Sequence, residues 1–306
     1  MKKHNSTKTS EPKFERRLTS FKNHLEDKEY SNSTIATYER FTNQFLEWTK
    51  KENIPTGQIR YQDILGYMKY CTGKKSYSQR TVQHTVITLS HYFDYLQETG
   101  TITSNPAKGI KVQGVKRKTL YHILEAQELH AIYHNYEATT PSQKKNKVIV
   151  GMLVYQGLKT EELNKLELKD IKLKEGKVEI PGGRKSNART LQLEPHQVMD
   201  VYDYAMQVRP QILARTRQQT NKLFVSVEGG DKLRIDFLME QIRKRNPKLE
   251  NADQLRASVI VKWLKQYNLR EVQYLAGHRY ISSTEAYKQS EMEGLTEEVN
   301  KFHPLG

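Results

Sequence analysis

Apolar side chains recur at spacings of three and four residues through most of residues 14–98, and this periodicity constrains the fold more than any other feature. We expect four helices. The first begins near residue 14, the second begins at a cap formed by Ser33 or Thr34, and the third and fourth span residues 60–71 and 78–98. Gly100 ends the fourth. Amphipathic helices of this kind bury their apolar faces against one another, so a compact helical bundle is predicted.

The rest of the chain mixes helices with a small amount of strand. The most apolar run, VIVGMLVY, predicts a buried helix over residues 146–157. Two alternating segments, 177–180 and 189–193, flank a Pro-Gly-Gly turn and predict antiparallel strands. Further helices are expected over residues 126–136, 195–208, 234–245, 254–266, 269–276, 282–287 and 296–302. The predicted fold class is mainly α with a small antiparallel β-sheet.

Composition changes along the chain suggest where the domains end. Residues 1–12 are polar and aperiodic, which is typical of a disordered basic tail. A helical domain over 13–104 would follow, and then a linker over 105–120 that holds five basic and no acidic residues. This linker either lies along a polyanion or is a solvated hinge. Residues 121–306 would form the second domain, which includes a C-terminal tail helix.

The chain is strongly basic, with 50 Lys and Arg against 35 Asp and Glu and a net charge of +15. Residues 1–120 hold 21 basic and 11 acidic side chains, so this part carries +10 of the total. The excess predicts a polyanionic partner such as nucleic acid, although a basic solvated surface would look the same.

The cysteine count and the lengths of the apolar runs indicate the cellular compartment of the protein. Cys71 is the only cysteine, so no intrachain disulfide and no cysteine-based zinc site can form. No apolar run reaches the roughly 20 residues of a membrane span, and the first ten residues have no apolar signal core. We therefore expect a soluble cytoplasmic protein.

The stretch Leu275–Tyr287 reads LAGHRYISSTEAY and places a tyrosine nine positions after His278. A phenol has a pKa near 10 and is a poor nucleophile unless a neighbour stabilises the phenolate or takes its proton. His278 can do either, or bind a phosphate oxygen. This stretch resembles the C-terminal motif of tyrosine recombinases, the phage-type integrases, and most of all their Xer-like members. The resemblance makes Tyr287 the nucleophile.

A second motif of that family, HxLRxS/T, resembles residues 253–258, DQLRAS. Arg256 matches the family's arginine, whose planar fork can hold two phosphate oxygens. Asp253 stands where the family has histidine, and a carboxylate cannot donate to phosphate unless it is protonated. We expect Asp253 to orient a neighbour instead.

The family's first arginine lies in a TGLRxxEL turn, and residues 156–163 here read QGLKTEEL. Lys159 keeps the positive charge of that arginine but lacks its bidentate fork. The general-acid lysine of the family precedes a strand, and residues 183–190, GRKSNART, resemble that hairpin. Arg184 has the register of this lysine, whereas Lys185 is chemically the better acid because a lysine pKa can fall toward neutrality. Arg184 would then supply the missing guanidinium.

The resemblance covers residues 14–303, including Ser33–Tyr38 in the N-terminal half, and implies both a fold and an activity. The fold would be a SAM-like helical core-binding domain and a mixed α+β catalytic domain that form a C-shaped clamp on DNA. Tyr287 would cut duplex DNA through a 3′-phosphotyrosine and rejoin it without cofactor or metal. The implied partners are double-stranded DNA, a second copy on each site, a tetramer in synapsis and accessory DNA-bending proteins, at the nucleoid of a bacterium.

Two alternatives remain at this stage. Lys159 and Asp253 depart from the family pattern, which would suit a recombinase-derived DNA-binding protein with weakened or no activity. A monomeric topoisomerase-like enzyme would use the same phosphotyrosine chemistry. Leu295, Val299 and Phe302 near the C-terminus suit an anchor that docks on a neighbouring subunit or on its own domain.

Overall fold

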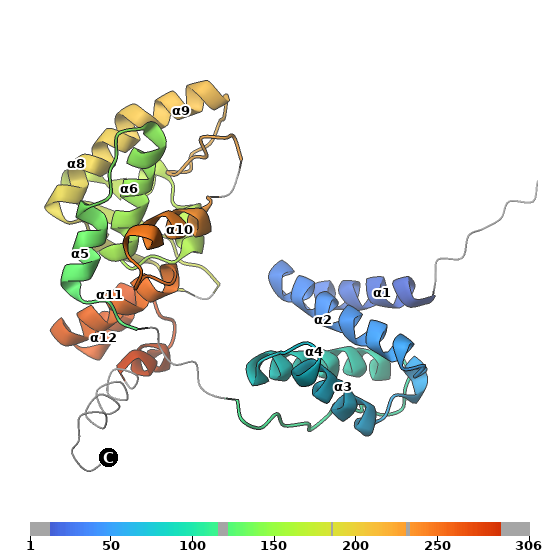
Figure 1. Cartoon of the computed structure of the whole chain (residues 1–306). Coiled ribbons are helices and arrows are strands. Elements are labelled where there is room, and N and C mark those ends of the chain that lie inside the picture. The colour runs from blue at the N-terminus through green and yellow to red at the C-terminus, as the bar shows by residue number, and fades with distance from the viewer. Residues whose placement is uncertain (1–12, 116–121, 185, 231–232, 289–306) are drawn as a thin grey trace, which may run out of the picture. The chain divides into compact units, whose positions relative to one another are not determined.

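The computed structural model describes residues 13–115, 122–184, 186–230 and 233–288, and the chain divides into two compact units at residues 118 and 119. Figure 1 shows helices in both units and labels most of them. No helix among these described residues is both long enough and apolar enough to cross a membrane. The predicted tail over residues 1–12 and the predicted last helix over 296–302 lie outside the described ranges.

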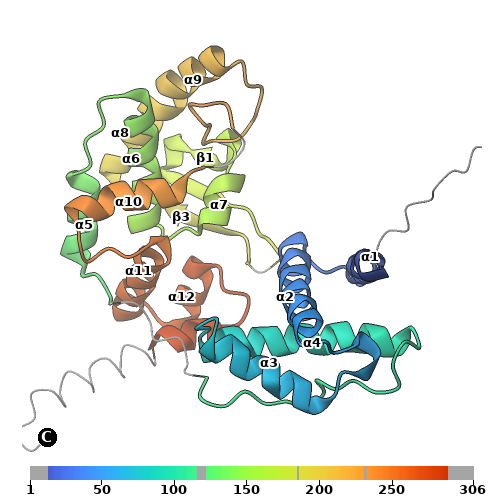
Figure 2. The same ribbon diagram turned by 45° about the vertical axis from the view of Figure 1, so that its right-hand side comes forward.

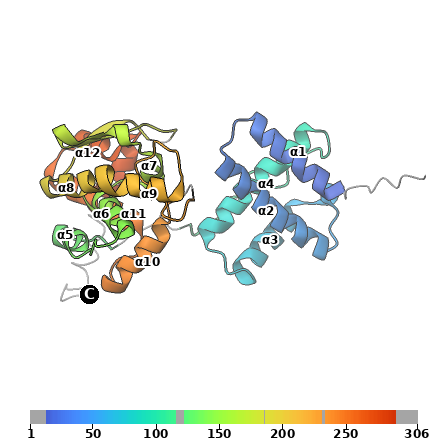
Figure 3. The same ribbon diagram turned by 90° about the horizontal axis from the view of Figure 1, so that it is seen from above.

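The first unit contains four α-helices. They are α1 (Lys13–Asp27), α2 (Asn32–Lys51), α3 (Tyr61–Gly73) and α4 (Gln79–Glu98), with a short 3-10 helix at Thr56–Gln58. α4 packs against the other three helices, which Figure 3 shows from above. The predicted bundle is therefore present.

The cap of α2 differs from the prediction. Ser31, not Ser33 or Thr34, accepts a hydrogen bond from the backbone N–H of Thr34, so the helix begins at Asn32. The Ser31 hydroxyl also lies 2.8 Å from the Thr34 hydroxyl. Any Ser or Thr in this run can cap a helix, and the sequence does not say which one has the extended backbone that a cap needs.

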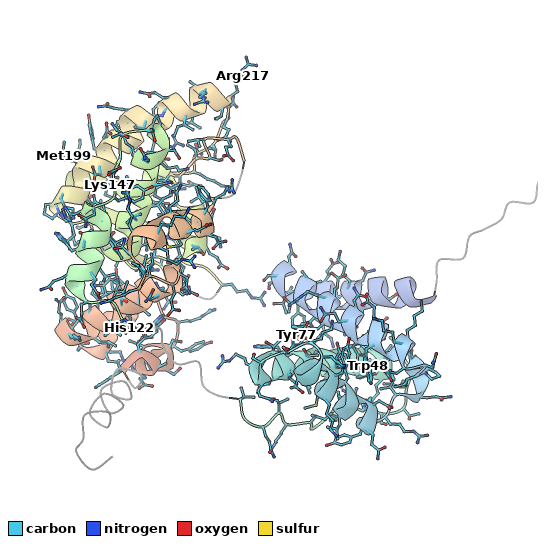
Figure 4. All side chains as sticks on the ribbon, viewed as in Figure 1. Trp48, Tyr77, His122, Lys147, Met199 and Arg217 are labelled. Atoms are coloured by element: carbon cyan, nitrogen blue, oxygen red, sulfur yellow. The ribbon has the colours of Figure 1, made fainter. Side chains whose placement is uncertain are left out.

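Aromatic and branched side chains fill the core of this unit. Phe45, Tyr67 and Phe93 are fully buried, and Trp48 lies among the helices (Figure 4). The segment predicted as a linker begins within this unit: Ala107 is buried, and Asn105 donates to the Ser90 carbonyl at 2.9 Å. Residues 105–112 are thus part of the first unit's packing.

The second unit is built around α6. Its helices are α5 (Ala126–His134), α6 (Pro141–Val154), α7 (Thr160–Lys165), α8 (Pro195–Asp203), α9 (Arg209–Thr216), α10 (Ile235–Arg245), α11 (Ala252–Gln266) and α12 (Leu269–Ala276), and residues 281–288 are also helical. α6 contacts α5, α8 and α11. Its residues Val148–Val154 are all buried, as expected for the most apolar run of the chain.

A three-stranded antiparallel sheet lies beside these helices (Figure 2). Its strands are β1 (Ile171–Lys172), β2 (Lys177–Ile180) and β3 (Arg189–Gln192), in that order. Val178 pairs with Leu191, and successive residues of β2 and β3 alternate between buried and more exposed positions, with the apolar residues buried. The two predicted strands are confirmed, and β1 is an addition too short to recognise from its sequence.

The prediction for residues 195–208 is partly wrong, because the helix does not end there. A π-helical turn, Tyr204–Val208, connects α8 directly to α9. Pro210 follows two residues after this π-helical turn. The helix therefore continues beyond residue 208, the predicted end.

Candidate active site

The turn that follows α12 gives the site its shape. Gly277 has a φ of +63° and ends α12 in the left-handed conformation. A Cβ on Gly277 would lie 2.4 Å from Nη1 of Arg189, so only glycine fits here. The backbone N–H of His278 then donates to the Gln273 carbonyl at 2.9 Å, which fixes the histidine just beyond the helix.

Arg256 lies in the second turn of α11 and is 4% exposed. Its Nη1 donates to the Gly157 carbonyl at 2.5 Å, and its Nη2 donates to the Ala276 carbonyl at 2.6 Å. These bonds join the α6–α7 turn to the end of α12 through one guanidinium. Burial lowers the pKa of Arg256, whereas the carboxylate of Glu162 opposes that change.

His278 lies against this guanidinium and is 7% exposed. Its Nε2 is 3.3 Å from Nη2 of Arg256, and its Nδ1 is 2.9 Å from the Thr284 hydroxyl. Burial and then the charges of Arg256 and Lys159 lower the pKa of His278 to about 3. The imidazole is therefore neutral at physiological pH.

Tyr287 lies in helix 281–288, one turn beyond Thr284. Its ring is stacked on that of His278, with centroids 5.7 Å apart and an interplanar angle of 16°. The helical spacing between residues 284 and 287 puts both side chains on the face that meets the histidine. The predicted pair of His278 and Tyr287 is thus brought together.

Lys159 lies at the N-terminal end of α7, after the turn at Gly157, and is half-buried. Burial, followed by the positive charge of Arg256, lowers its pKa. Its backbone N–H donates to Oε2 of Glu162 at 2.9 Å. Lys159 is therefore held at the same pocket as Arg256.

A buried ion pair stabilises this arrangement. Arg189 donates through Nη1 and Nη2 to the two carboxylate oxygens of Glu162, at 2.8 and 2.9 Å. Burial alone would raise the pKa of Glu162, but the hydrogen bonds from Arg189 hold it below its ordinary value. The sequence presented both residues only as parts of motifs, and no local pattern indicated their pairing.

The hairpin between β2 and β3 is attached to the same turn. The backbone N–H of Asn187 donates to the Gly277 carbonyl at 3.1 Å, and Ser186 forms a β-bridge with His278. Nη1 of Arg279 donates to the Arg184 carbonyl at 2.7 Å. Lys185, the predicted general acid, lies outside the described residues.

These side chains surround a pocket of about 570 Å³. It is lined by Lys159, Arg184, Arg256, His278, Arg279, Tyr280, Ser283 and Tyr287. Five of the predicted site residues are in this list. Asp253 is not, because it is exposed in the first turn of α11, although its charge acts on Arg256. The sequence reasoning did not identify Arg279, Ser283 or Thr284.

The pocket can bind a tetrahedral phosphate and activate a phenol. Lys159, Arg184, Arg256 and Arg279 supply positive charge, and Tyr287 supplies the only acidic hydroxyl besides that of Tyr280 among these lining residues. No group of three or more metal-ligating side chains that could hold a metal ion occurs within the described ranges.

Comparison with known proteins gives the family. Residues 122–293 match the model of the phage integrase family, and residues 18–100 match the model of the N-terminal SAM-like domain of phage integrases. The chain belongs to the phage integrase family, because the first match alone covers more than half of it.

Its relatives match along nearly their whole length. Tyrosine recombinase XerD of Listeria innocua is 26% identical over 286 residues, which are 91% of this chain and 95% of that protein. Tyrosine recombinase XerC of Oceanobacillus iheyensis is 24% identical over 285 residues, 91% of this chain and 92% of that protein.

Solved structures show the same fold. XerH recombinase bound to its difH substrate before cleavage matches with a TM-score of 0.68 and 18% identity, over 92% of this chain and 88% of that one. A lambda integrase dimer bound to a COC′ core site matches with a TM-score of 0.64 and 14% identity, over 90% of this chain and 77% of that one.

Proposed function

We propose that this protein is a site-specific DNA recombinase that cuts and rejoins duplex DNA through a covalent bond to Tyr287. The observation that carries this proposal is the stacking of Tyr287 on His278, inside the pocket that Arg256 and Lys159 also line. Family membership supports the same activity.

The chemistry follows from the groups in the pocket. The oxygen of Tyr287 attacks a phosphorus atom of the DNA, the bond to the 5′ oxygen breaks, and the 3′ end stays on the tyrosine as a phosphate ester. A 5′-hydroxyl then attacks that ester and releases Tyr287, so each phosphodiester is exchanged for another of similar energy. His278, which is neutral, accepts the tyrosine proton.

Two cations stabilise the charge that develops on the phosphate. A guanidinium has five N–H groups, and three of those on Arg256 are directed to Gly157, Ala276 and His278. The remaining two can donate to phosphate oxygens, and the ammonium of Lys159 adds three more donors. Lys185 protonates the leaving 5′ oxygen, or Arg184 binds the phosphate from the same hairpin.

The partners follow from this reaction. Double-stranded DNA is the substrate, two copies occupy one site, and four copies assemble in synapsis so that strands can be exchanged between sites. A basic protein that neutralises many phosphates must bind in a salt-dependent way. Accessory DNA-bending proteins and a location at the bacterial nucleoid are part of this proposal.

The two alternatives have less support. A binding protein without chemistry would not need Arg256, His278 and Tyr287 to share one pocket, yet they do. A topoisomerase would act without a defined site or a partner copy, and no residue of the described pocket favours it over a recombinase.

The test measures whether the protein forms a covalent adduct with a nicked suicide duplex. The duplex carries a binding site that is first selected from random-sequence DNA. The wild-type protein should form a protein–DNA adduct that survives denaturation. Tyr287→Phe should form none while its DNA affinity stays within about twofold, because only the attacking oxygen is removed. Tyr280→Phe, a change in the same pocket, is the matched control and should keep the adduct. An adduct with Tyr287→Phe would disprove the assignment.

A further inference from the structure

The second unit contains another pocket, of about 600 Å³, that shares no lining residue with the active-site pocket. It lies between the α5–α6 connection, α6, residues 226–228 and 233–235, and α10. Its apolar lining includes Ile132, Ile149, Leu233, Ile235, Leu238 and Ile242. A volume of this size lies within the roughly 300–1,000 Å³ of small-molecule sites.

Lys145 of α6 lines this pocket and is only 8% exposed. It makes no hydrogen bond or ion pair with any described residue. Its neighbour Lys144, outside the pocket, instead pairs with Asp203 at 2.8 Å. The side chain of Lys145 is thus largely buried, with no described counterion in contact.

Apart from Lys244, the other charged side chains that line this pocket form ion pairs. Arg245 pairs with Glu137 at 3.5 Å, and Arg234 pairs with Glu228 at 3.8 Å. Glu228 acts on Lys145 through its charge but is not within ion-pair distance. Lys145 therefore leaves the pocket with a positive charge that the described side chains do not neutralise.

Burying an unpaired charge is costly, and burial lowers the pKa of Lys145 accordingly. A bound anion would remove that cost by pairing with the ammonium. The N-terminal turn of α6 adds to this, because Ser142 and Gln143 also line the pocket and a helix N-terminus favours negative charge. The positive charge favours a negatively charged group on the ligand, and the apolar walls favour an apolar part of the same ligand.

We propose that this pocket binds a small organic anion, a carboxylate or phosphate monoester carried on an apolar body, with its charged group on Lys145. The apolar body lies against the side chains of α6 and α10. The site is independent of DNA strand transfer, so the proposal does not rest on the function proposed above.

The test uses the full chain and 8-anilinonaphthalene-1-sulfonate, an anion with an apolar aromatic body whose fluorescence rises on burial. Wild type should bind one equivalent saturably. Lys145→Met keeps most of the length of the side chain and removes the charge, and it should weaken binding at least tenfold. Lys144→Met is the matched control and should bind as wild type does. The melting temperature of Lys145→Met should not be lower, since an unpaired buried charge has been removed.

A second variant locates the probe without changing Lys145. Phe237 lines the pocket and is half-exposed, so Phe237→Trp places a tryptophan at its rim. Energy transfer from tryptophan to bound probe should exceed that in wild type, which has two tryptophans. No gain would place the probe elsewhere and overturn the proposal.

Competition identifies the ligand class. Decanoate and decyl phosphate are compared as competitors, and displacement by either supports the proposal and shows which charged group is preferred. Failure of both would overturn it. So would equal probe affinity in wild type and Lys145→Met, or one-to-one displacement of the probe by a peptide of residues 289–306, which would make the pocket a docking site for the chain's own C-terminus.

Discussion

Nη2 of Arg256 lies 3.3 Å from Nε2 of His278, and this contact indicates which ring nitrogen of the neutral histidine carries the proton. A guanidinium only donates hydrogen bonds, so Nε2 must accept and carries no proton. The ring proton is therefore on Nδ1, which lies 2.9 Å from the Thr284 hydroxyl. In the proposed reaction His278 would therefore be a neutral acceptor, whose orientation is set by residues from α11 and helix 281–288.

The first prediction concerns stability against pH. The pKa of His278 is about 3 in the folded protein and about 6.5 in the unfolded chain, so the unfolded chain binds the proton more readily. The stability contributed by a neutral His278 is complete above pH 6.5 and is lost as the pH falls toward 3. The stability advantage of wild type over His278→Asn should shrink by about 1.5 kcal/mol between pH 6.5 and 5. Urea unfolding of both proteins measures this, and an advantage independent of pH would contradict it.

The second prediction concerns Lys159. Removing a cation that stabilises the transition state should slow cleavage, so Lys159→Ala should cut a suicide substrate about 10²–10³-fold more slowly with little change in DNA affinity. Lys165→Ala, at the exposed end of α7, is the control and should cut at the normal rate.

Lys159→Arg distinguishes two forms of the site. A retained or faster rate would mean that Lys159 occupies the position of the family's arginine, and a slower one that the pocket is adapted to lysine. If Lys159→Ala cleaved as fast as wild type, the phosphate would have to be neutralised by other groups.

The third prediction concerns Gly277. Gly277→Ala combines a left-handed backbone with a Cβ 2.4 Å from Nη1 of Arg189, so it should displace Arg189 from Glu162 and destabilise the protein by about 2–4 kcal/mol. Gly176 has a similar φ of +62°, but its Cβ would approach nothing closer than 3.9 Å. Gly176→Ala should therefore cost only about 1 kcal/mol. Equal losses in melting temperature would show that contact with Arg189 is not what requires glycine at 277.

The fourth prediction concerns the C-terminus. Deleting residues after Gly294 removes the apolar side chains at 295, 299 and 302, which suit an anchor between subunits. The truncated protein should bind a single half-site normally and assemble less cooperatively on a full site, as gel-shift titrations would show. Unchanged cooperativity would mean that this segment does not join subunits.

Local sequence determined most of the helices. α12 has the predicted bounds, Leu269–Ala276, because Asn268 caps its start and Gly277 ends it. The buried run of α6 was recognisable from composition alone. The extension of α8 into α9 was not, since the π-helical turn that accommodates Pro210 depends on the packing of Tyr204 and Val208 in the core.

The same distinction between local sequence and tertiary structure applies to the residues of the site. The spacing of His278 and Tyr287 by nine residues, and the types of residue at 159 and 256, could be read from the chain by itself, because a motif preserves the order of chemical groups. Only the tertiary structure decided that Arg189 pairs with Glu162, that Asp253 lies outside the pocket and that Lys145 is largely buried with no partner among the described residues. These contacts join, or depend on, segments far apart in the chain, where the packing of α6, α11 and the hairpin, and not local propensity, determines which side chains meet.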